Sequence, residues 1–293
     1  MDIGMNLPVM VPGWDRDSLL DWCRRIDAGP FSSLAAGERV WFPNPEMMVA
    51  MSAAAAVTER VQLQFSVVVL PMHSALNVAK QVATLDVLSA GRVVLGVGVG
   101  GREEDYAAFG ADYSGPKLKR LEQGVDLMRR AWAGERVVET ALRPLEPAPL
   151  QPGGPPVLAG SIFPGSIKRA ARWADGISGF SFGPSKDEVG QCFDTARDAW
   201  QAAGRDTPPR LVVSCWYALG PGGREQMDTY LNRYLNFMGP GVAETMAPMA
   251  TTDSADKLRD VVSMLEDLGA DELLLVPTTG DADEVDRVAD LVG

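Results

Sequence analysis

The sequence predicts an α/β protein of the (β/α)8 TIM-barrel class, with a helical insertion after the seventh strand and a single domain over residues 1–293. Two observations favour this class. Short apolar segments, typical of strands buried in a parallel sheet, alternate with segments whose apolar residues recur at helical spacing. Short turns join most of these segments, which fits a closed barrel better than an open sheet. Strands are expected at residues 2–7, 33–38, 61–70, 93–99, 156–160, 176–181, 210–219 and 272–277.

Helices are expected between these strands and after the last one. The helix at 254–268 stops at Gly269, because glycine readily takes the left-handed conformation that ends many helices. The other helices are expected at residues 17–28, 46–58, 74–88, 118–132 and 167–174, in a segment that reaches about residue 203, and at 283–292.

Two long connections interrupt this alternation. Residues 143–156 carry six prolines, and we interpret this proline-rich loop as a stiff surface excursion. Residues 220–252 follow the seventh strand and carry Tyr230 and Tyr234 at helical spacing. This helical insertion packs on the barrel, covers the active site or pairs with a second subunit.

The fourth strand ends in alternating glycines that include Gly96, Gly98 and Gly100. Because glycine carries no Cβ, we expect a flat ring or a phosphate to approach the backbone closely there. The pattern is not Gly-x-Gly-x-x-Gly followed directly by a helix, so it does not indicate a Rossmann nucleotide site. Arg102 and Asp105, which come next, are interpreted as a solvated helix start.

The composition excludes several classes of function. With 27 Lys and Arg against 39 Asp and Glu, the formal net charge is −12, which argues against nucleic-acid and membrane-surface partners. The chain has three widely separated cysteines and neither a bilayer-length apolar run nor a basic leader, so a cytoplasmic location is expected. Its one histidine, His73, excludes a multi-histidine metal site, and no metal is expected.

Catalytic groups of a barrel lie where the strands end. Asn6 lies near the end of the first predicted strand, and Glu38 and Arg39 lie at the end of the second. A carboxylate beside a guanidinium is either a proton-handling pair or a surface ion pair. After the fifth strand, free backbone N–H groups near Gly160 and Ser161 and the start of a helix form either an anion site or an ordinary helix cap.

Several motifs together resemble one known family. They are Ser66-Val-Val-Val-Leu-Pro-Met-His73, Ser89-Ala-Gly-Arg92, Leu95-Gly-Val-Gly98, Glu103-Glu-Asp-Tyr-Ala-Ala-Phe-Gly110 and Ala170-Ala-Arg-Trp-Ala-Asp-Gly176. The combination is similar to the bacterial luciferase-like flavin oxidoreductases, and most similar to their actinobacterial branch that uses the deazaflavin coenzyme F420.

The resemblance implies a barrel that binds F420, or alternatively FMN, at the C-terminal ends of its strands. It implies a non-proline cis peptide at Ser66–Val67, behind the flavin ring. It also implies a phosphate site at Ala159, Gly160 and Ser161, and a ring-facing end of the fourth strand at Gly98 and Gly100. A homodimer is expected on the same ground.

The chain departs from the family's F420 dehydrogenases at two places. Some of those enzymes carry Asp-His where this chain has Glu38-Arg39, and arginine cannot accept a proton near neutral pH. They also carry a glutamate where this chain has Gly101. The remaining candidates for a proton donor are Glu38, Glu103 and Glu104.

We therefore expect a two-electron oxidoreductase that transfers hydride between F420 and a small organic substrate. An FMN-dependent monooxygenase is the first alternative, and a cofactor-binding barrel without turnover is the second. A phosphate-handling barrel without flavin is the third, and it predicts an ordinary trans bond at Ser66–Val67.

Overall fold

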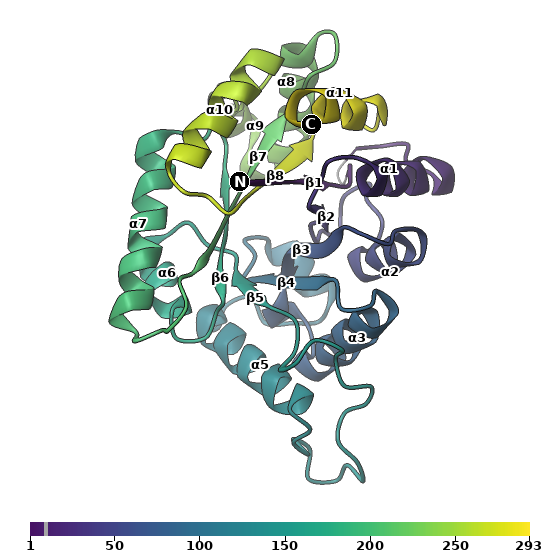
Figure 1. Cartoon of the computed structure of the whole chain (residues 1–293), viewed down its shortest axis with the longest axis vertical. Helices are drawn as coiled ribbons and strands as arrows, with labels where there is room; N and C mark the ends of the chain where they lie inside the picture. The colour runs from purple at the N-terminus through teal and green to yellow at the C-terminus, as the bar shows by residue number, and fades with distance from the viewer. Residues whose placement is uncertain (9–10) are drawn as a thin grey trace.

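The computed structural model describes residues 1–8 and 11–293. Its eight strands form a closed parallel barrel in the order β1 to β8, with β8 pairing back onto β1 (Figure 1). The strands are β1 Asp2–Asn6, β2 Ser33–Ala36, β3 Gln62–Val69, β4 Val93–Gly98, β5 Val157–Ala159, β6 Gly176–Ser181, β7 Arg210–Tyr217 and β8 Glu272–Pro277. The predicted (β/α)8 TIM barrel is confirmed.

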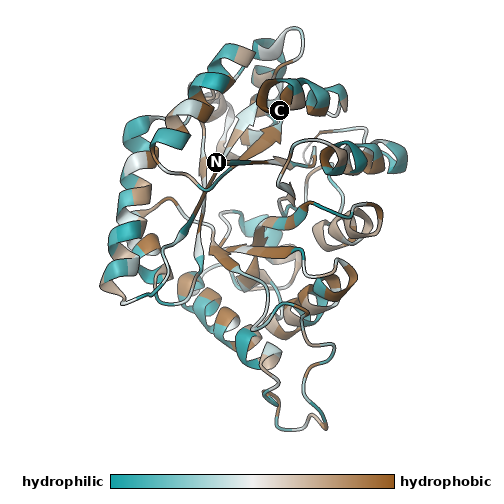
Figure 2. Cartoon of the chain, viewed as in Figure 1, coloured by the Kyte–Doolittle hydropathy of each residue, from teal (hydrophilic) through white to brown (hydrophobic). Residues whose placement is uncertain are grey.

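Helices surround the barrel and present their apolar sides to it (Figure 2). The α-helices are α1 Arg16–Ala28, α2 Met47–Val57, α3 Ala75–Leu88, α4 Glu103–Ala108, α5 Lys117–Trp132, α6 Pro164–Ala170, α7 Lys186–Ala202, α8 Gly223–Leu235, α9 Pro240–Met246, α10 Ala255–Asp267 and α11 Asp283–Val292. Short 3-10 turns lie at η1 Leu70–Met72, η2 Asn236–Met238 and η3 Ala247–Met249. The insertion after β7 is therefore helical, as predicted, and consists of α8, η2, α9 and η3.

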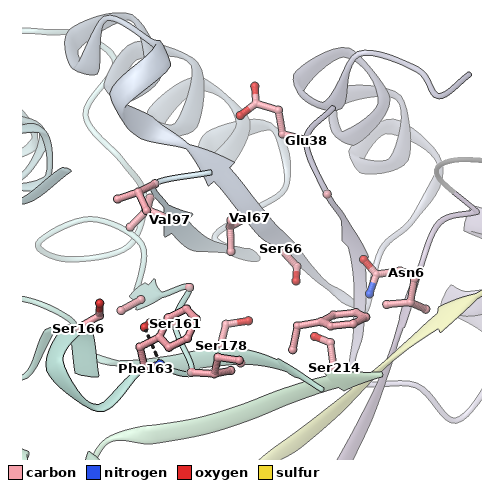
Figure 3. Close-up of a pocket in the computed structure, with 18 of the residues that line it drawn as sticks. Asn6, Glu38, Ser66, Val67, Val97, Ser161, Phe163, Ser166, Ser178 and Ser214 are labelled. Carbon is pink, nitrogen blue, oxygen red and sulfur yellow. Dashed lines mark hydrogen bonds between the residues drawn. The ribbon is translucent and has the colours of Figure 1, made fainter. Parts of the chain in front are cut away.

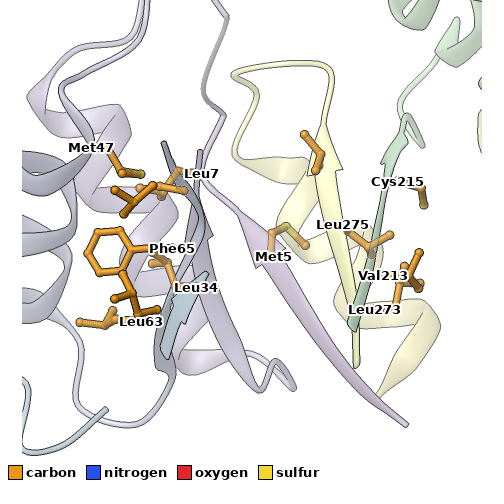
Figure 4. Close-up of a cluster of buried hydrophobic side chains, with 14 of the residues drawn as sticks. Met5, Leu7, Leu34, Met47, Leu63, Phe65, Val213, Cys215, Leu273 and Leu275 are labelled. Atoms are coloured by element: carbon orange, nitrogen blue, oxygen red, sulfur yellow. The ribbon is translucent and has the colours of Figure 1, made fainter. Parts of the chain in front are cut away.

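The hydrophobic core lies mainly between the barrel and its helices. Successive strand residues point to opposite faces, so Leu273 and Leu275 face outward while Leu274 faces the barrel interior. Figure 4 shows outward-facing groups on two sides of the barrel, one around Leu34, Leu63 and Phe65 and one around Val213, Cys215 and Leu273. The interior holds small and branched side chains, namely Ala35, Val94, Leu158, Val212 and Leu274.

A buried ion pair closes the barrel interior at the end opposite the site. Glu272 is fully buried, and Arg210 donates to its carboxylate at 2.9 Å. The hydroxyls of Ser32 and Ser33 donate to the same carboxylate at 2.6 and 2.5 Å. A buried carboxylate needs such partners, because water no longer solvates it.

The proline-rich loop extends away from the barrel between α5 and β5 (Figure 1). Its end is attached to α3, because buried Asp86 accepts from the backbone N–H of Gln151 at 2.9 Å and from its side-chain amide at 2.7 Å. Pro156 has no N–H and joins the sheet only through its carbonyl, which accepts from Leu95 at 2.9 Å. The fifth strand is therefore shorter than expected.

Candidate active site

A cavity of about 410 Å³ lies at the C-terminal ends of the strands, where catalytic groups of a barrel gather (Figure 3). Most of the side chains predicted for the site line it. They are Asn6, Glu38, Arg39, Ser66, Val67, Ala159, Gly160 and Ser161. Gly98, Gly100 and Glu103 are not among its lining residues.

One wall of the cavity is formed by a bulge in β3. The peptide bond between Ser66 and Val67 is cis, as the resemblance implies, and the pairing of β3 with β4 shifts register between Phe65 and Val68. The bulge points Ser66 and Val67 toward the side chains of β6 and β7 across the cavity (Figure 3).

The glycines in and just after β4 make room for the side chains of β3. A Cβ placed on Gly98 would lie 2.8 Å from a methyl group of Val67, and one on Gly160 would lie 2.9 Å from the other methyl group. Gly100 has a φ of +60°, and a Cβ placed on it would lie 2.7 Å from a methyl group of Val69. The side-chain positions of Gly98 and Gly100 thus face neighbouring valines, and the contact of this strand end with a ring stays a prediction.

The segment after β5 is less open to an anion than predicted. The N–H of Gly160 donates to Val97 at 2.7 Å, and the N–H groups of Phe163 and Ser166 also have partners within the segment. Helix α6 has only seven residues and begins with Pro164, which carries no N–H. Three of the expected free backbone groups, those of Gly160, Phe163 and Ser166, are thus occupied. The hydroxyls of Ser161 and Ser166 are the polar side chains that this segment presents to the cavity.

Neutral polar side chains lie deeper in the cavity, on strands far apart in the sequence. Asn6 comes from β1, Ser178 from β6 and Ser214 from β7, and all three line the cavity (Figure 3). Within the described residues, Asn6 Nδ2 and both serine hydroxyls are buried and have no hydrogen-bond partner. Ser178 and Ser214 were missed in the sequence, although polar residues at inward-facing positions of otherwise apolar strands were the available signal.

Glu38 does not pair with Arg39. One carboxylate oxygen of Glu38 accepts from the N–H of Val69 at 2.6 Å, and the other lies 2.7 Å from His73 Nε2. Arg39 Nη1 instead donates to the backbone carbonyl of Glu38 at 2.9 Å, and its Nη2 donates to the hydroxyl of Tyr234 at 2.7 Å. The predicted carboxylate–guanidinium pair is corrected: the partner of Glu38 is His73, which is remote in sequence.

Tyr234 brings the helical insertion into the cavity wall. It lines the cavity together with Arg39, Tyr230 and Trp216, and its ring centroid lies 5.1 Å from that of Trp216. Burial would raise the pKa of the Tyr234 phenol, but the guanidinium groups of Arg39 and Arg102 outweigh burial and lower this pKa below its usual value. The insertion therefore packs on the barrel and also walls the site.

Arg102 is buried, which corrects its interpretation as part of a solvated helix start. Its side chain is only 4% exposed, and its guanidinium carbon lies 3.4 Å from the ring centroid of Phe237 and 4.6 Å from that of Phe42. Asp105 is buried beside it. Such contacts between a cation and aromatic faces stabilise the buried charge in place of water.

Two properties of the described residues concern membranes and metals. None of the helices there is both long and apolar enough to cross a membrane. Within the same residues, no cluster of histidine, cysteine, aspartate or glutamate side chains is arranged to hold a metal ion.

Comparison with known sequences places most of the chain in one group of enzymes. A model of the luciferase-like monooxygenase family matches residues 1–260. The uncharacterized protein Rv0953c of Mycobacterium tuberculosis is 32% identical over 171 residues, which are 56% of this chain and 59% of that protein. The chain thus covers less than two thirds of that curated relative's length. Limonene 1,2-monooxygenase of Rhodococcus erythropolis is 38% identical over 96 residues, 33% of this chain and 24% of the enzyme.

Solved structures share the fold over nearly their whole length. Monooxygenase RslO1 of Streptomyces bottropensis has a TM-score of 0.81 at 23% identity, with 99% of this chain and 97% of that chain covered. An F420-dependent secondary alcohol dehydrogenase in complex with an F420-acetone adduct has a TM-score of 0.78 at 16% identity, covering 100% and 98%. The FMN-bound oxygenating constituent of 3,6-diketocamphane monooxygenase of Pseudomonas putida has a TM-score of 0.71 at 17% identity, covering 99% and 96%. At these identities the likeness shows the fold.

Proposed function

The chain belongs to the luciferase-like monooxygenase family, and from this premise we propose that it is a two-electron oxidoreductase that binds coenzyme F420. The reaction is hydride exchange with a small apolar organic substrate in the cavity at the barrel mouth. The cofactor supplies the hydride chemistry when bound, and the chain binds, orients and shields the reactants.

The observation that carries this proposal is a set of neutral polar groups without hydrogen-bond partners, those of Asn6, Ser178 and Ser214, which together form what we call the cavity floor. Asn6 Nδ2 and the hydroxyls of Ser178 and Ser214 are buried without partners among the described residues. Buried polar groups normally have partners, so their ligand should bring hydrogen-bonding atoms along one edge. The pyrimidine edge of a deazaflavin or flavin ring carries carbonyl and N–H groups of this kind.

The walls suit the rest of such a cofactor. Val67 and Val97 offer apolar surface to a ring face. Ser161 and Ser166 would hold the phosphate of the side chain, and the polar segment after β5 thereby keeps the role that the sequence suggested, through hydroxyls rather than free backbone groups.

Two other functions have specific support. An FMN-dependent monooxygenase is favoured by the FMN-bound structural neighbour and by the monooxygenase with a TM-score of 0.81. A cofactor-binding barrel without turnover is favoured by the Glu38 carboxylate, whose two oxygens already bond to His73 and Val69.

Titration of the apo-protein with F420 and with FMN separates these functions. We expect F420 to bind more tightly, as followed by the fluorescence of the deazaflavin. Binding of FMN alone would refute the F420 proposal. Oxidation of the reduced cofactor by members of a ketone and enone panel would reject the barrel without turnover.

Two variants test the cavity floor directly. Ser178→Ala and Ser214→Ala each remove one hydrogen bond to the ring, worth about 1 kcal/mol, and should weaken cofactor affinity about five-fold. Ser52→Ala on α2 is the matched control, since Ser52 is exposed and its hydroxyl donates to Met48 within the same helix. Equal affinity in all three variants would contradict this placement of the ring edge.

A homodimer and a cytoplasmic location complete the proposal. Exposed apolar side chains of the insertion, among them Phe237, Met238 and Met249, offer a surface for a second subunit. Cys23, Cys192 and Cys215 are free thiols, which suits a reducing compartment. Light scattering of the purified protein tests the dimer.

A further inference from the structure

Tyr234 and two arginines form a cluster contributed by the segments that follow β2, β4 and β7. Arg39 follows β2, Arg102 precedes α4, and Tyr234 lies on α8 of the insertion. Arg39 donates to the phenolic oxygen at 2.7 Å, and the guanidinium carbon of Arg102 lies 5.2 Å from the centre of the phenol ring. Arg39 and Tyr234 both line the cavity.

The charges in this cluster do not balance. Two guanidinium groups face one buried carboxylate, that of Asp105, which accepts from the N–H of Val40 at 3.2 Å. Glu104 is 3.9 Å from Arg102, but its side chain is 48% exposed and is solvated. Burial and the nearby charge of Arg39 lower the pKa of Arg102, as expected where positive charge is in excess.

Ionised Tyr234 would neutralise the excess. Its neighbour Tyr230, which stacks on it with ring centroids 6.1 Å apart, has a pKa that burial raises. Tyr234 differs because the positive charges of Arg39 and Arg102 outweigh the effect of burial and lower its pKa. The same helix therefore carries two phenols whose acidities are shifted in opposite directions.

The hydroxyl hydrogen of Tyr234 has no acceptor in the described part of the chain. Its oxygen accepts from Arg39, and among the described residues the hydroxyl donates to no atom. A phenol held in this way can donate its proton into the cavity that it lines. Glu38 is less suited to this task, because both its carboxylate oxygens have partners.

We propose that Tyr234 is the catalytic acid and base of this enzyme, that it acts on the oxygen of an apolar ketone, enone or secondary alcohol, and that Arg39 and Arg102 position and stabilise its phenolate. This proposal rests on the proposed function. The substrate is expected to be apolar because Phe180, Trp216 and Tyr230 line the cavity around the phenol.

The step is balanced in atoms and electrons. In reduction, the carbonyl π bond breaks, a hydride from the reduced cofactor forms the new C–H bond, and the Tyr234 proton forms the new O–H bond. The hydride carries the two electrons that reduce the carbonyl. The phenolate left behind is balanced by the two arginines and regains a proton from water. Oxidation of the alcohol is the reverse.

Ultraviolet difference titration of the apo-protein tests the ionisation without any cofactor. The chain has five tyrosines, and burial raises the pKa of Tyr106 to about 12 and also raises those of Tyr217 and Tyr230. In a Tyr113→Phe background, which removes the remaining tyrosine besides Tyr234, we expect one phenol to ionise well below these three. That signal should vanish in Tyr234→Phe and persist in Tyr230→Phe, the matched control one helical turn away.

If Tyr234→Phe does not fold, two arginine variants can still test whether Tyr234 ionises at lowered pH. Arg39→Gln and Arg102→Gln each leave the phenol in place and remove one positive charge, so the low-pH signal should move to higher pH. A signal that survives in Tyr234→Phe, or that does not move in either arginine variant, would overturn the proposal.

Kinetics then test the catalytic role. Removal of a general acid typically costs about 100- to 10,000-fold in kcat, and Tyr234→Phe should lose this much while its affinity for the cofactor stays the same. In Tyr234→Phe, the plot of kcat against pH should also lose the slope that reports ionisation of the Tyr234 phenol. A Tyr234→Phe variant with unchanged kcat would refute the role. Failure to bind F420 or FMN would instead refute the proposed function and leave the titration result standing.

Discussion

Gly98→Ala should lower the free energy of unfolding by about 1–2 kcal/mol and also weaken binding of the cofactor. The new Cβ would lie 2.8 Å from a methyl group of Val67, about 1 Å closer than an ordinary contact. Val67 cannot withdraw along the wall, because its methyl groups already fill the space beside Gly96 and Gly160. It can move only toward the cavity, where the ring is proposed to bind.

The magnitude follows from two opposing effects. Overpacking a filled site costs about 1–3 kcal/mol. Replacing glycine by alanine returns about 0.4–1 kcal/mol by restricting the unfolded chain, where the native backbone conformation suits alanine. Gly98 meets this condition, because its φ lies outside the left-handed region. The net loss is therefore about 1–2 kcal/mol.

Urea unfolding at constant m-value measures this loss, and two variants control it. Gly101→Ala is the matched substitution three residues away, where a Cβ would meet nothing within 4 Å, and it should cost nothing. In a Val67→Ala background the nearest Val67 atom would be its Cβ at 3.9 Å, so Gly98→Ala should become harmless. Equal effects of Gly98→Ala and Gly101→Ala, or an undiminished loss in the double variant, would refute the reasoning.

Three further predictions concern stability. Asp86→Ala leaves the backbone N–H of Gln151 unpartnered and its side-chain amide with the carbonyl of Val93 alone, so it should cost about 1–3 kcal/mol and speed proteolysis of the proline-rich loop. An unchanged cleavage rate would contradict this prediction. Arg210→Met leaves buried Glu272 without its ion-pair partner and should lower the free energy of unfolding in urea by about 3 kcal/mol. Adding Glu272→Gln should restore part of this loss. If it restores none, the unpaired charge of Glu272 is not the cause of the loss. Burial raises the pKa of Glu284, so the folded state binds this proton more readily than the unfolded state, and its contribution to stability is lost as pH rises through the raised pKa. Glu284→Gln should flatten that part of the profile of Tm against pH, and an unchanged slope would count against the assignment.

The order of strands and helices was predictable because each element follows from local periodicity. Apolar runs such as 93–99 and helical stripes such as 254–268 depend on backbone geometry that repeats every two or about 3.6 residues. Several element ends were displaced, as at β2, which ends at Ala36 rather than residue 38, and helix α9 and the 3-10 turns were not predicted. The resemblance added the cis bond at Ser66–Val67, which no local periodicity encodes.

The candidate site was predictable in position but not in its contacts. Barrel topology places Asn6, Glu38 and Gly160 at one rim, and all three line the cavity. The partner of Glu38 was not predictable, because His73 is 35 residues away and reaches it only after β3 turns into η1. Glu103 lies in the segment that follows β4 but outside the cavity lining.

By itself, the sequence determined a parallel barrel with its polar residues at the strand ends and a helical insertion after the seventh strand. Only the tertiary structure decided that the β4 glycines accommodate Val67, that Ser178 and Ser214 meet on the cavity floor, and that Tyr234 lies between two arginines. The physical reason is distance along the chain. Local patterns set which way a backbone runs, whereas contacts between side chains of remote strands depend on closure of the whole barrel.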